Sequence, residues 1–123
     1  MSENFYKFDN TEVNPNFPQV KDVDPQEVFQ ATNGVFLVDV RRPDEYTGEL
    51  GHVPGSILIT LDTLGEHMDK IPKDKTVVFV CRSGGRSASA AAMAMDDGYS
   101  EVFNMKGGMI QWNQLELVTE GKS

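Results

Sequence analysis

The sequence has few of the features on which disulfide-bonded, metal-binding or membrane-spanning proteins depend. Among its 123 residues there is one cysteine, Cys81. A single thiol forms neither an intramolecular disulfide nor a metal site built on several cysteines. No apolar stretch reaches the length of about 20 residues that a transmembrane helix needs, and the opening stretch MSENFYKFDN lacks the basic and apolar regions of a signal peptide. We therefore expect a protein of the cytoplasm.

Positive charge is also scarce, and its distribution is uneven. Lysine and arginine number 11 against 19 aspartates and glutamates, which gives a formal net charge of −8. Such a balance argues against nucleic acid or an acidic membrane as a partner. Residues 76–95 nevertheless contain no acidic side chain, whereas Arg82 and Arg86 lie beside the cysteine. The sequence therefore predicts a locally positive site that binds a small anionic substrate.

The pattern of apolar residues predicts strands that alternate with helices. Short β-branched runs such as VFLVDV and TVVFV are typical of strands buried on both faces, and alternation with helices indicates an α/β fold with a mostly parallel sheet. Asp24 to Glu27 reads as a capping box that opens the first helix. The expected strands are 35–40, 56–59, 76–80 and 101–104, and the expected helices are 24–33, 43–46, 61–70, 85–97 and 109–117. Residues 1–18 read as an extended arm whose order the sequence leaves open, 19–117 as one domain and 118–123 as a tail.

Cys81 follows an expected strand and precedes an expected helix. Ligands of open parallel sheets bind at the carboxyl ends of the strands, so this position suits chemistry. Gly84 and Gly85 allow consecutive backbone amides to point into one concavity, and the start of the helix adds further N–H groups, so the sequence predicts a reactive thiolate in an anion-binding nest. A lone cysteine is more often a small buried apolar residue. Two glycines and two arginines within the next five residues favour the nucleophile instead.

Four segments resemble the rhodanese-like sulfurtransferases, specifically the single-domain kind. They are VDVRRPDEY (38–46), GHVPGS (51–56), CRSGGRS (81–87) and FNMKGGMIQW (103–112). CRSGGR resembles the active-site loop of the family, and the segments occur in the family's order. Leu58 departs from the pattern, because the family usually has a polar residue there. The resemblance implies a rhodanese-like fold over residues 19–117, with a central, mostly parallel five-stranded sheet and helices on both faces.

The resemblance also implies a reaction. In this family a cysteine thiolate takes a sulfur atom from a donor such as thiosulfate, holds it as a persulfide and passes it to cyanide or a thiol. Carried over to this chain, Cys81 is the nucleophile, and the loop that binds the substrate consists of Arg82, Ser83, Gly84, Gly85 and Arg86. Arginine suits this task because its planar fork of donors matches oxyanions. No metal or organic cofactor is needed, and the only thiol must discharge to an external thiol or protein acceptor.

Several polar residues outside the loop are expected to support it. Asp39 ends a buried strand, where a carboxylate needs partners, and the family suggests that it braces the active site. Arg41 and Glu45 are four residues apart and are predicted to pair. His52, in a Gly-His-Val-Pro-Gly turn, is expected to bond to backbone rather than to act as a base. Ser87 is expected to cap nearby helix-turn amides.

Two other classes of protein remain as alternatives. Cysteine phosphatases and arsenate reductases also place a thiolate before a helix, but five residues separate their cysteine from the closing arginine. Here four residues separate Cys81 from Arg86, and the smaller loop suits a single sulfur better than a phosphate. Non-catalytic interaction modules of this fold commonly lose the cysteine, which this chain retains. The sequence leaves the oligomeric state and the natural donor and acceptor open.

Overall fold

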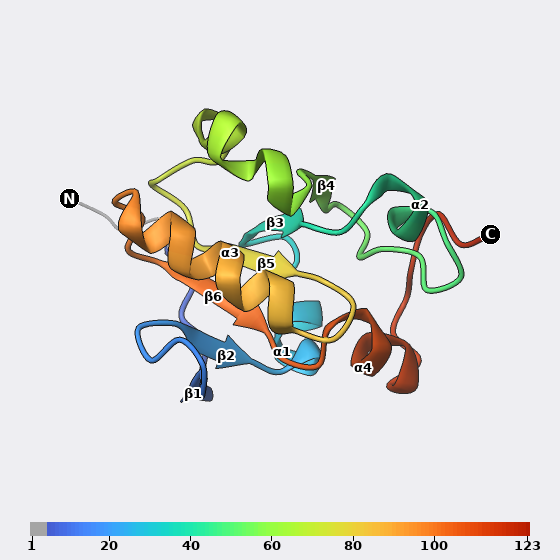
Figure 1. Cartoon of the computed structure of the whole chain (residues 1–123). Coiled ribbons are helices and arrows are strands. Elements are labelled where there is room, and N and C mark those ends of the chain that lie inside the picture. Colours follow the sequence, from blue (N-terminus) through green and yellow to red (C-terminus); the bar gives the residue numbers. More distant parts are fainter. Residues whose placement is uncertain (1–4) are drawn as a thin grey trace.

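The central feature of the fold is one six-stranded sheet. The computed structural model describes residues 5–123, and its strands lie in the order β1-β2-β6-β5-β3-β4 (Figure 1). β1 runs antiparallel to β2, and all the other neighbours are parallel. The strands are β1 (Thr11–Val13), β2 (Lys21–Val23), β3 (Phe36–Asp39), β4 (Ile57–Leu58), β5 (Val77–Val80) and β6 (Val102–Met105).

The expectation of five strands was wrong. β1 comes from the segment expected as an arm, and β2 precedes the first helix, so a hairpin extends the sheet at one edge. Both strands have three residues, TEV and KDV, and are too short and too polar to show a strand pattern in the sequence. Residues 1–4 of the expected arm lie outside the described part of the chain, and the domain boundaries stay a prediction.

Helices cover both faces of the sheet, as the sequence predicts. Val77 and Phe79 of β5 contribute to one apolar cluster, and Val78 and Val80 to the other, as the alternation of a buried strand requires. In Figure 1, α3 lies across the near face of the sheet and α1 lies behind it. The helices are α1 (Pro25–Gln30), α2 (Pro43–Tyr46), η1, a 3-10 helix (Leu61–Lys70), α3 (Gly85–Asp96) and α4 (Gly108–Gln114). Within residues 5–123 none of these helices combines the length and apolar character of a membrane span.

The start of α1 differs from the expected capping box. The side chain of Asp24 makes no capping hydrogen bond, although Pro25 does occupy the first turn. The carboxylate of Glu27 instead accepts hydrogen bonds from the backbone N–H groups of Asp9 and Asn10, at 2.9 and 3.1 Å. The acidic residue that would close the box therefore binds the N-terminal segment to the domain.

The parallel strands bring their carboxyl ends to one edge of the sheet. Asp39 ends β3, Cys81 follows β5, and Met105 ends β6. Val38 of β3 lies opposite Phe79 of β5, and Phe79 lies opposite Asn104 of β6. This register places the carboxyl ends of these three strands beside one another.

Candidate active site

The thiol of Cys81 lies in a tight loop between β5 and α3. Its Sγ accepts hydrogen bonds from the backbone N–H of Gly84 at 3.1 Å and from the hydroxyl of Ser87 at 3.2 Å. Gly84 precedes α3 with a φ of 106°, a conformation that favours glycine and turns its amide toward the sulfur. Cys81 itself is 1% exposed. Two hydrogen-bond donors are thus directed at one sulfur.

The start of α4 supports this loop from behind. The backbone N–H groups of Met109 and Ile110 donate to the carbonyl oxygens of Cys81 and Arg82, at 2.8 and 3.0 Å. A Cβ added to Gly108 would lie 2.4 Å from the Arg82 oxygen, so only glycine permits this approach. These contacts with α4 fix the backbone of Cys81 and Arg82 in the loop whose Gly84 amide binds the sulfur.

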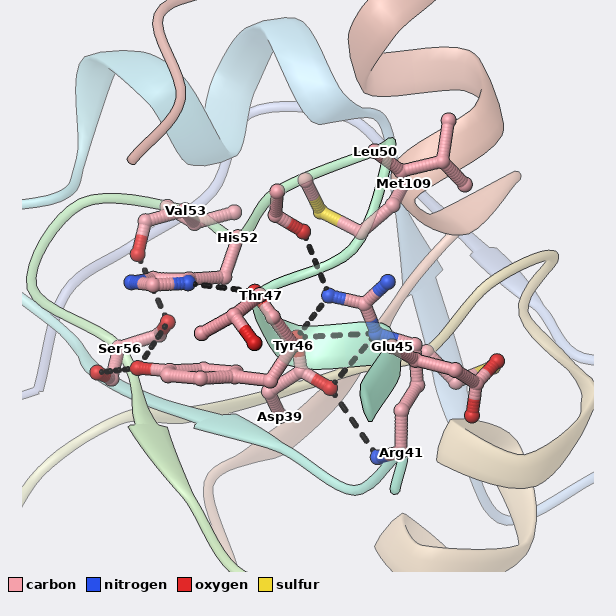
Figure 2. Close-up of polar contacts among 12 residues, drawn as sticks. Asp39, Arg41, Glu45, Tyr46, Thr47, Leu50, His52, Val53, Ser56 and Met109 are labelled. Carbon is pink, nitrogen blue, oxygen red and sulfur yellow. Dashed lines mark hydrogen bonds and ion pairs between the residues drawn. The ribbon is translucent and has the colours of Figure 1, made fainter. Parts of the chain in front are cut away.

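A buried ion pair lies at the end of β3. The guanidinium of Arg41 binds the Asp39 carboxylate, with Nε 2.9 Å from Oδ1 and an Nη 2.8 Å from Oδ2, and donates to the Gly51 carbonyl at 2.7 Å (Figure 2). The side chains of Arg41 and Asp39 are 1% and 0% exposed. The predicted pair of Arg41 with Glu45 was wrong, because Arg41 precedes α2 and turns back toward the sheet.

Glu45 instead binds Arg86 of the active-site loop. The two Nη atoms of Arg86 lie 2.8 and 3.0 Å from the two carboxylate oxygens of Glu45. The hydrogen bond from Arg86 is the main cause that lowers the pKa of Glu45 from 4.5 to about 2, against partial burial, which raises it. The same bond raises the pKa of Arg86. The carboxylate of Glu45 on α2 thus partly neutralises the positive charge that the sequence predicts at the loop.

The Glu45→Gln variant should lose a pH-dependent part of the protein's stability. The pKa of Glu45 is lower in the folded protein than its ordinary value, so the pair stabilises the fold fully above pH 4.5 and ceases to do so as the pH falls to about 2. Urea unfolding at several pH values should therefore show the wild type more stable at neutral pH, with the difference vanishing near pH 2. Glu49→Gln is the matched control at a carboxylate without an ion pair among the described residues, and an equal difference at every pH would contradict the assignment.

A shallow hollow opens beside the loop. Its volume is about 160 Å³. It is lined by Arg41, Asp44, Glu45, Gly48, Glu49, Leu50 and Arg82. Arg82 and Ser83 of the loop are exposed, and no ion pair involves Arg82 within residues 5–123. Arg82 is therefore the guanidinium of the loop that is available to an anion.

His52 contacts the backbone, as its turn predicts. Its Nδ1 lies 2.8 Å from the carbonyl oxygen of Tyr46 and must donate, because a carbonyl only accepts. The imidazole stacks on the Tyr46 ring with centroids 3.6 Å apart (Figure 2). The backbone of His52 pairs with that of Glu120 near the C-terminus. No hydrogen bond joins His52 to Cys81 in the described residues. The ring orders the turn rather than the thiol.

Ser87, which contacts the sulfur, and its partner Asn104 differ from the sequence prediction. Ser87 was expected to cap backbone amides, but its hydroxyl contacts Cys81 Sγ and the Oδ1 atom of Asn104. Asn104 was not singled out from the sequence. Its position inside a short strand, as a polar residue among apolar ones, was the available signal.

Comparison with known proteins agrees with this arrangement. The sequence profile of the Rhodanese-like domain matches residues 24–115, which include the whole loop. A protein named Sulfurtransferase from Allochromatium vinosum is 38% identical over 96 residues, an alignment that covers 76% of this chain and 88% of the relative.

Solved structures show the same fold. A rhodanese-like domain protein from Staphylococcus aureus has a TM-score of 0.68 and 27% identity, over 81% of this chain and 93% of that one. A protein of unknown function from Rhodopseudomonas palustris, described as a possible tyrosine phosphatase, has a TM-score of 0.74 and 29% identity, over 82% and 85% of the two chains. Because of the second likeness, the fold alone does not distinguish sulfur transfer from phosphate-ester hydrolysis.

Proposed function

The chain belongs to the family of rhodanese-like domains, and on that premise we propose that it is a sulfurtransferase that carries sulfur as a persulfide on Cys81. One observation carries the proposal: Cys81 Sγ accepts hydrogen bonds from the Gly84 amide and the Ser87 hydroxyl inside a loop closed by Arg86. The relative named Sulfurtransferase covers most of the chain and supports the same activity.

The proposed reaction has two steps, written here with thiosulfate and cyanide. The Cys81 thiolate attacks the outer sulfur of thiosulfate; a new S–S bond forms, the S–S bond of the donor breaks, and sulfite leaves with the electron pair. The enzyme then holds Cys–S–S⁻. Cyanide attacks the outer sulfur and leaves as thiocyanate, which returns the thiolate with its charge. A thiolate acceptor reacts in the same way and becomes a persulfide.

The loop residues have separate tasks in this scheme. The exposed guanidinium of Arg82 meets the anionic donor, because it has no carboxylate partner among the described residues. Arg86 adds positive potential while its pair with Glu45 fixes its position. The Gly84 amide binds Sγ, and we expect the amides of residues 82–86, with the Ser83 hydroxyl, to bind the negative outer sulfur of the persulfide.

The acceptor must come from outside the chain. Cys81 is the only cysteine, so no second thiol can resolve the persulfide internally. Because Cys81 is only 1% exposed, an acceptor has to approach closely over its loop to reach the sulfur. We propose a small thiol or the thiol of a partner protein as acceptor, with cyanide as a test compound.

Phosphoryl transfer is the rival that the Rhodopseudomonas palustris structure raises. Four residues separate Cys81 from Arg86, and the carbonyls of Cys81 and Arg82 are tied to α4. This short, braced loop leaves room for one sulfur atom more readily than for a tetrahedral phosphate. Sulfur transfer is therefore the reading that the loop favours.

Steady-state kinetics test the proposal directly. With thiosulfate and cyanide varied together, thiocyanate formation should give parallel double-reciprocal lines, because the two substrates meet the enzyme in turn. Cys81→Ser should abolish the reaction. Cys81-dependent release of phosphate from p-nitrophenyl phosphate, without thiocyanate formation, would contradict sulfur transfer and support the phosphatase.

A further inference from the structure

A chain of buried polar side chains leads from Cys81 to β2. Ser87 contacts Asn104, the Nδ2 of Asn104 donates to Asp22 Oδ1 at 2.9 Å, and Asn14 Nδ2 donates to the same oxygen at 2.9 Å. These four residues are between 0% and 7% exposed. The sulfurtransfer scheme uses only the first of them, and nothing in it explains why a buried carboxylate and two amides lie behind the thiol.

The orientation of each amide in this chain is fixed by its partners. The Oδ1 of Asn14 accepts the backbone N–H groups of Asn16 and Phe17, at 2.9 and 3.0 Å, so its Nδ2 must face Asp22. An ionised carboxylate only accepts, so Asn104 also turns its Nδ2 toward Asp22. The Oδ1 of Asn104 is thereby left facing Ser87.

Ser87 consequently has one proton and two acceptors. Its Oγ lies 3.2 Å from Cys81 Sγ and within hydrogen-bonding distance of Asn104 Oδ1, and a hydroxyl donates only one hydrogen bond at a time. The residue is fully buried, so a hydroxyl without an acceptor would be costly. Two acceptors therefore give the hydroxyl a partner whichever way it turns.

We propose that the Ser87 hydroxyl is a two-position donor and that Asn104, oriented by Asp22, is a positioning residue for the thiol. The hydroxyl donates to Sγ while Cys81 is a thiolate. When Cys81 carries a persulfide, the negative charge lies on the outer sulfur, and the hydroxyl turns to Asn104 Oδ1. The part of this inference that concerns the persulfide rests on the proposed function. The part that concerns the thiolate does not, because Sγ and Asn104 Oδ1 compete for the Ser87 proton in the free thiolate as well.

Charged side chains near Cys81 also affect its thiolate, and the test variants replace none of them. Arg82 belongs to the loop that contains Cys81, and Arg86 lies in the first turn of α3. The charged residues near the site on other elements are Asp22 on β2, Asp39 and Arg41 at the end of β3, Asp44 and Glu45 on α2, Glu49 after α2 and Lys106 after β6. A variant at Asn104 changes none of these charges.

The Asn104→Leu variant tests the proposal, because leucine resembles asparagine in shape but accepts no hydrogen bond. Ser87 should then donate to Sγ alone and favour the thiolate. The pH at which iodoacetamide alkylation of Cys81 reaches half its maximal rate should fall by roughly 0.5–1 pH unit. Ser87→Ala should raise that pH, and Asn104→Leu should have no further effect in the Ser87→Ala background. Asn104→Val, which suits a strand, replaces the leucine variant if that one does not fold.

Thr76→Val is the matched control, because it removes a buried hydrogen-bonding side chain at the other end of β5. It should leave the pH profile unchanged. An Asn104 variant with an unchanged profile, or a shift that persists in the Ser87→Ala background, would overturn the proposal. Alkylation needs no sulfur donor, so this outcome is independent of whether the protein transfers sulfur.

The persulfide state gives a second readout. In Asn104→Leu the hydroxyl has no acceptor except the uncharged Sγ of the persulfide, so the persulfide should be disfavoured relative to the thiolate. In a mixture of glutathione and glutathione persulfide, the ratio of persulfide to free Cys81 should fall about three- to tenfold relative to wild type. An unchanged ratio would contradict the two-position donor, whereas absence of any persulfide in the wild type would contradict the proposed function instead.

Discussion

The Asp39→Ala variant should lose about 3–5 kcal/mol of its free energy of unfolding, a large part of what a domain of this size has. Asp39 and Arg41 are both buried, and the Asp39 carboxylate accepts three hydrogen bonds from the Arg41 side chain and one from its backbone N–H. Without the carboxylate, the Gly51 carbonyl is the one hydrogen-bond partner that the Arg41 guanidinium keeps among residues 5–123. Urea unfolding followed by circular dichroism measures the loss.

Two further variants separate this effect from a general sensitivity to charge. Arg42→Ala removes the neighbouring arginine, whose pair with Asp44 is exposed, and should leave the unfolding midpoint unchanged. The double variant Asp39→Leu with Arg41→Met should recover much of the lost stability, because no unpaired charge remains buried. A small loss in Asp39→Ala, or no recovery in the double variant, would contradict a buried pair.

The Gly108→Val variant should lose about a hundredfold in sulfur transfer, although Gly108 carries no reacting group. Its φ of 58° is unfavourable for a β-branched residue, and an added Cβ would lie 2.4 Å from the Arg82 oxygen and 2.5 Å from that of Cys81. The loop must move away from α4, and a displacement of about 1 Å at a reacting group costs about a hundredfold in rate. Thiocyanate formation from thiosulfate and cyanide is the assay.

Gly65→Ala is the control for this prediction. Gly65 lies in η1 and does not require a positive φ. A Cβ added there would meet nothing within 4 Å among the described residues apart from its own helix backbone, so the Gly65→Ala variant should keep full activity. Gly108→Val should remain folded by circular dichroism, since the change is confined to the contact between α4 and the loop. Full activity in folded Gly108→Val would show that α4 does not set the geometry of the loop.

The central strands and their helices were predictable because their signals are local. β5 is an uninterrupted apolar run that ends at a loop with two glycines, and the helix after it begins as the sequence predicts. β1 and β2 were missed because three polar-rich residues carry no periodic signal, and their pairing depends on a turn at Asn14. β1 and β2 are therefore defined by the strands they pair with rather than by their own sequence.

In the candidate site, too, the local segment was predictable and the contacts between distant segments were not. The order Cys81, Gly84 and Arg86 is local and predicts an anion-binding loop. The partners of the loop come from far along the chain: Glu45 is 41 residues from Arg86, and Asn104 is 17 residues from Ser87. Only the parallel register of β3, β5 and β6 brings them together, so the sequence predicts the nucleophile but not the residues that tune it.

The central claim is that Cys81 carries sulfur, and an intact mass spectrum tests it most directly. After brief incubation with thiosulfate and removal of the excess, the wild-type protein should gain the mass of one sulfur atom, and cyanide should remove it. Cys81→Ser, treated identically, should gain nothing. A wild-type protein that gains no sulfur, or a serine variant that gains it equally, would contradict a persulfide on Cys81.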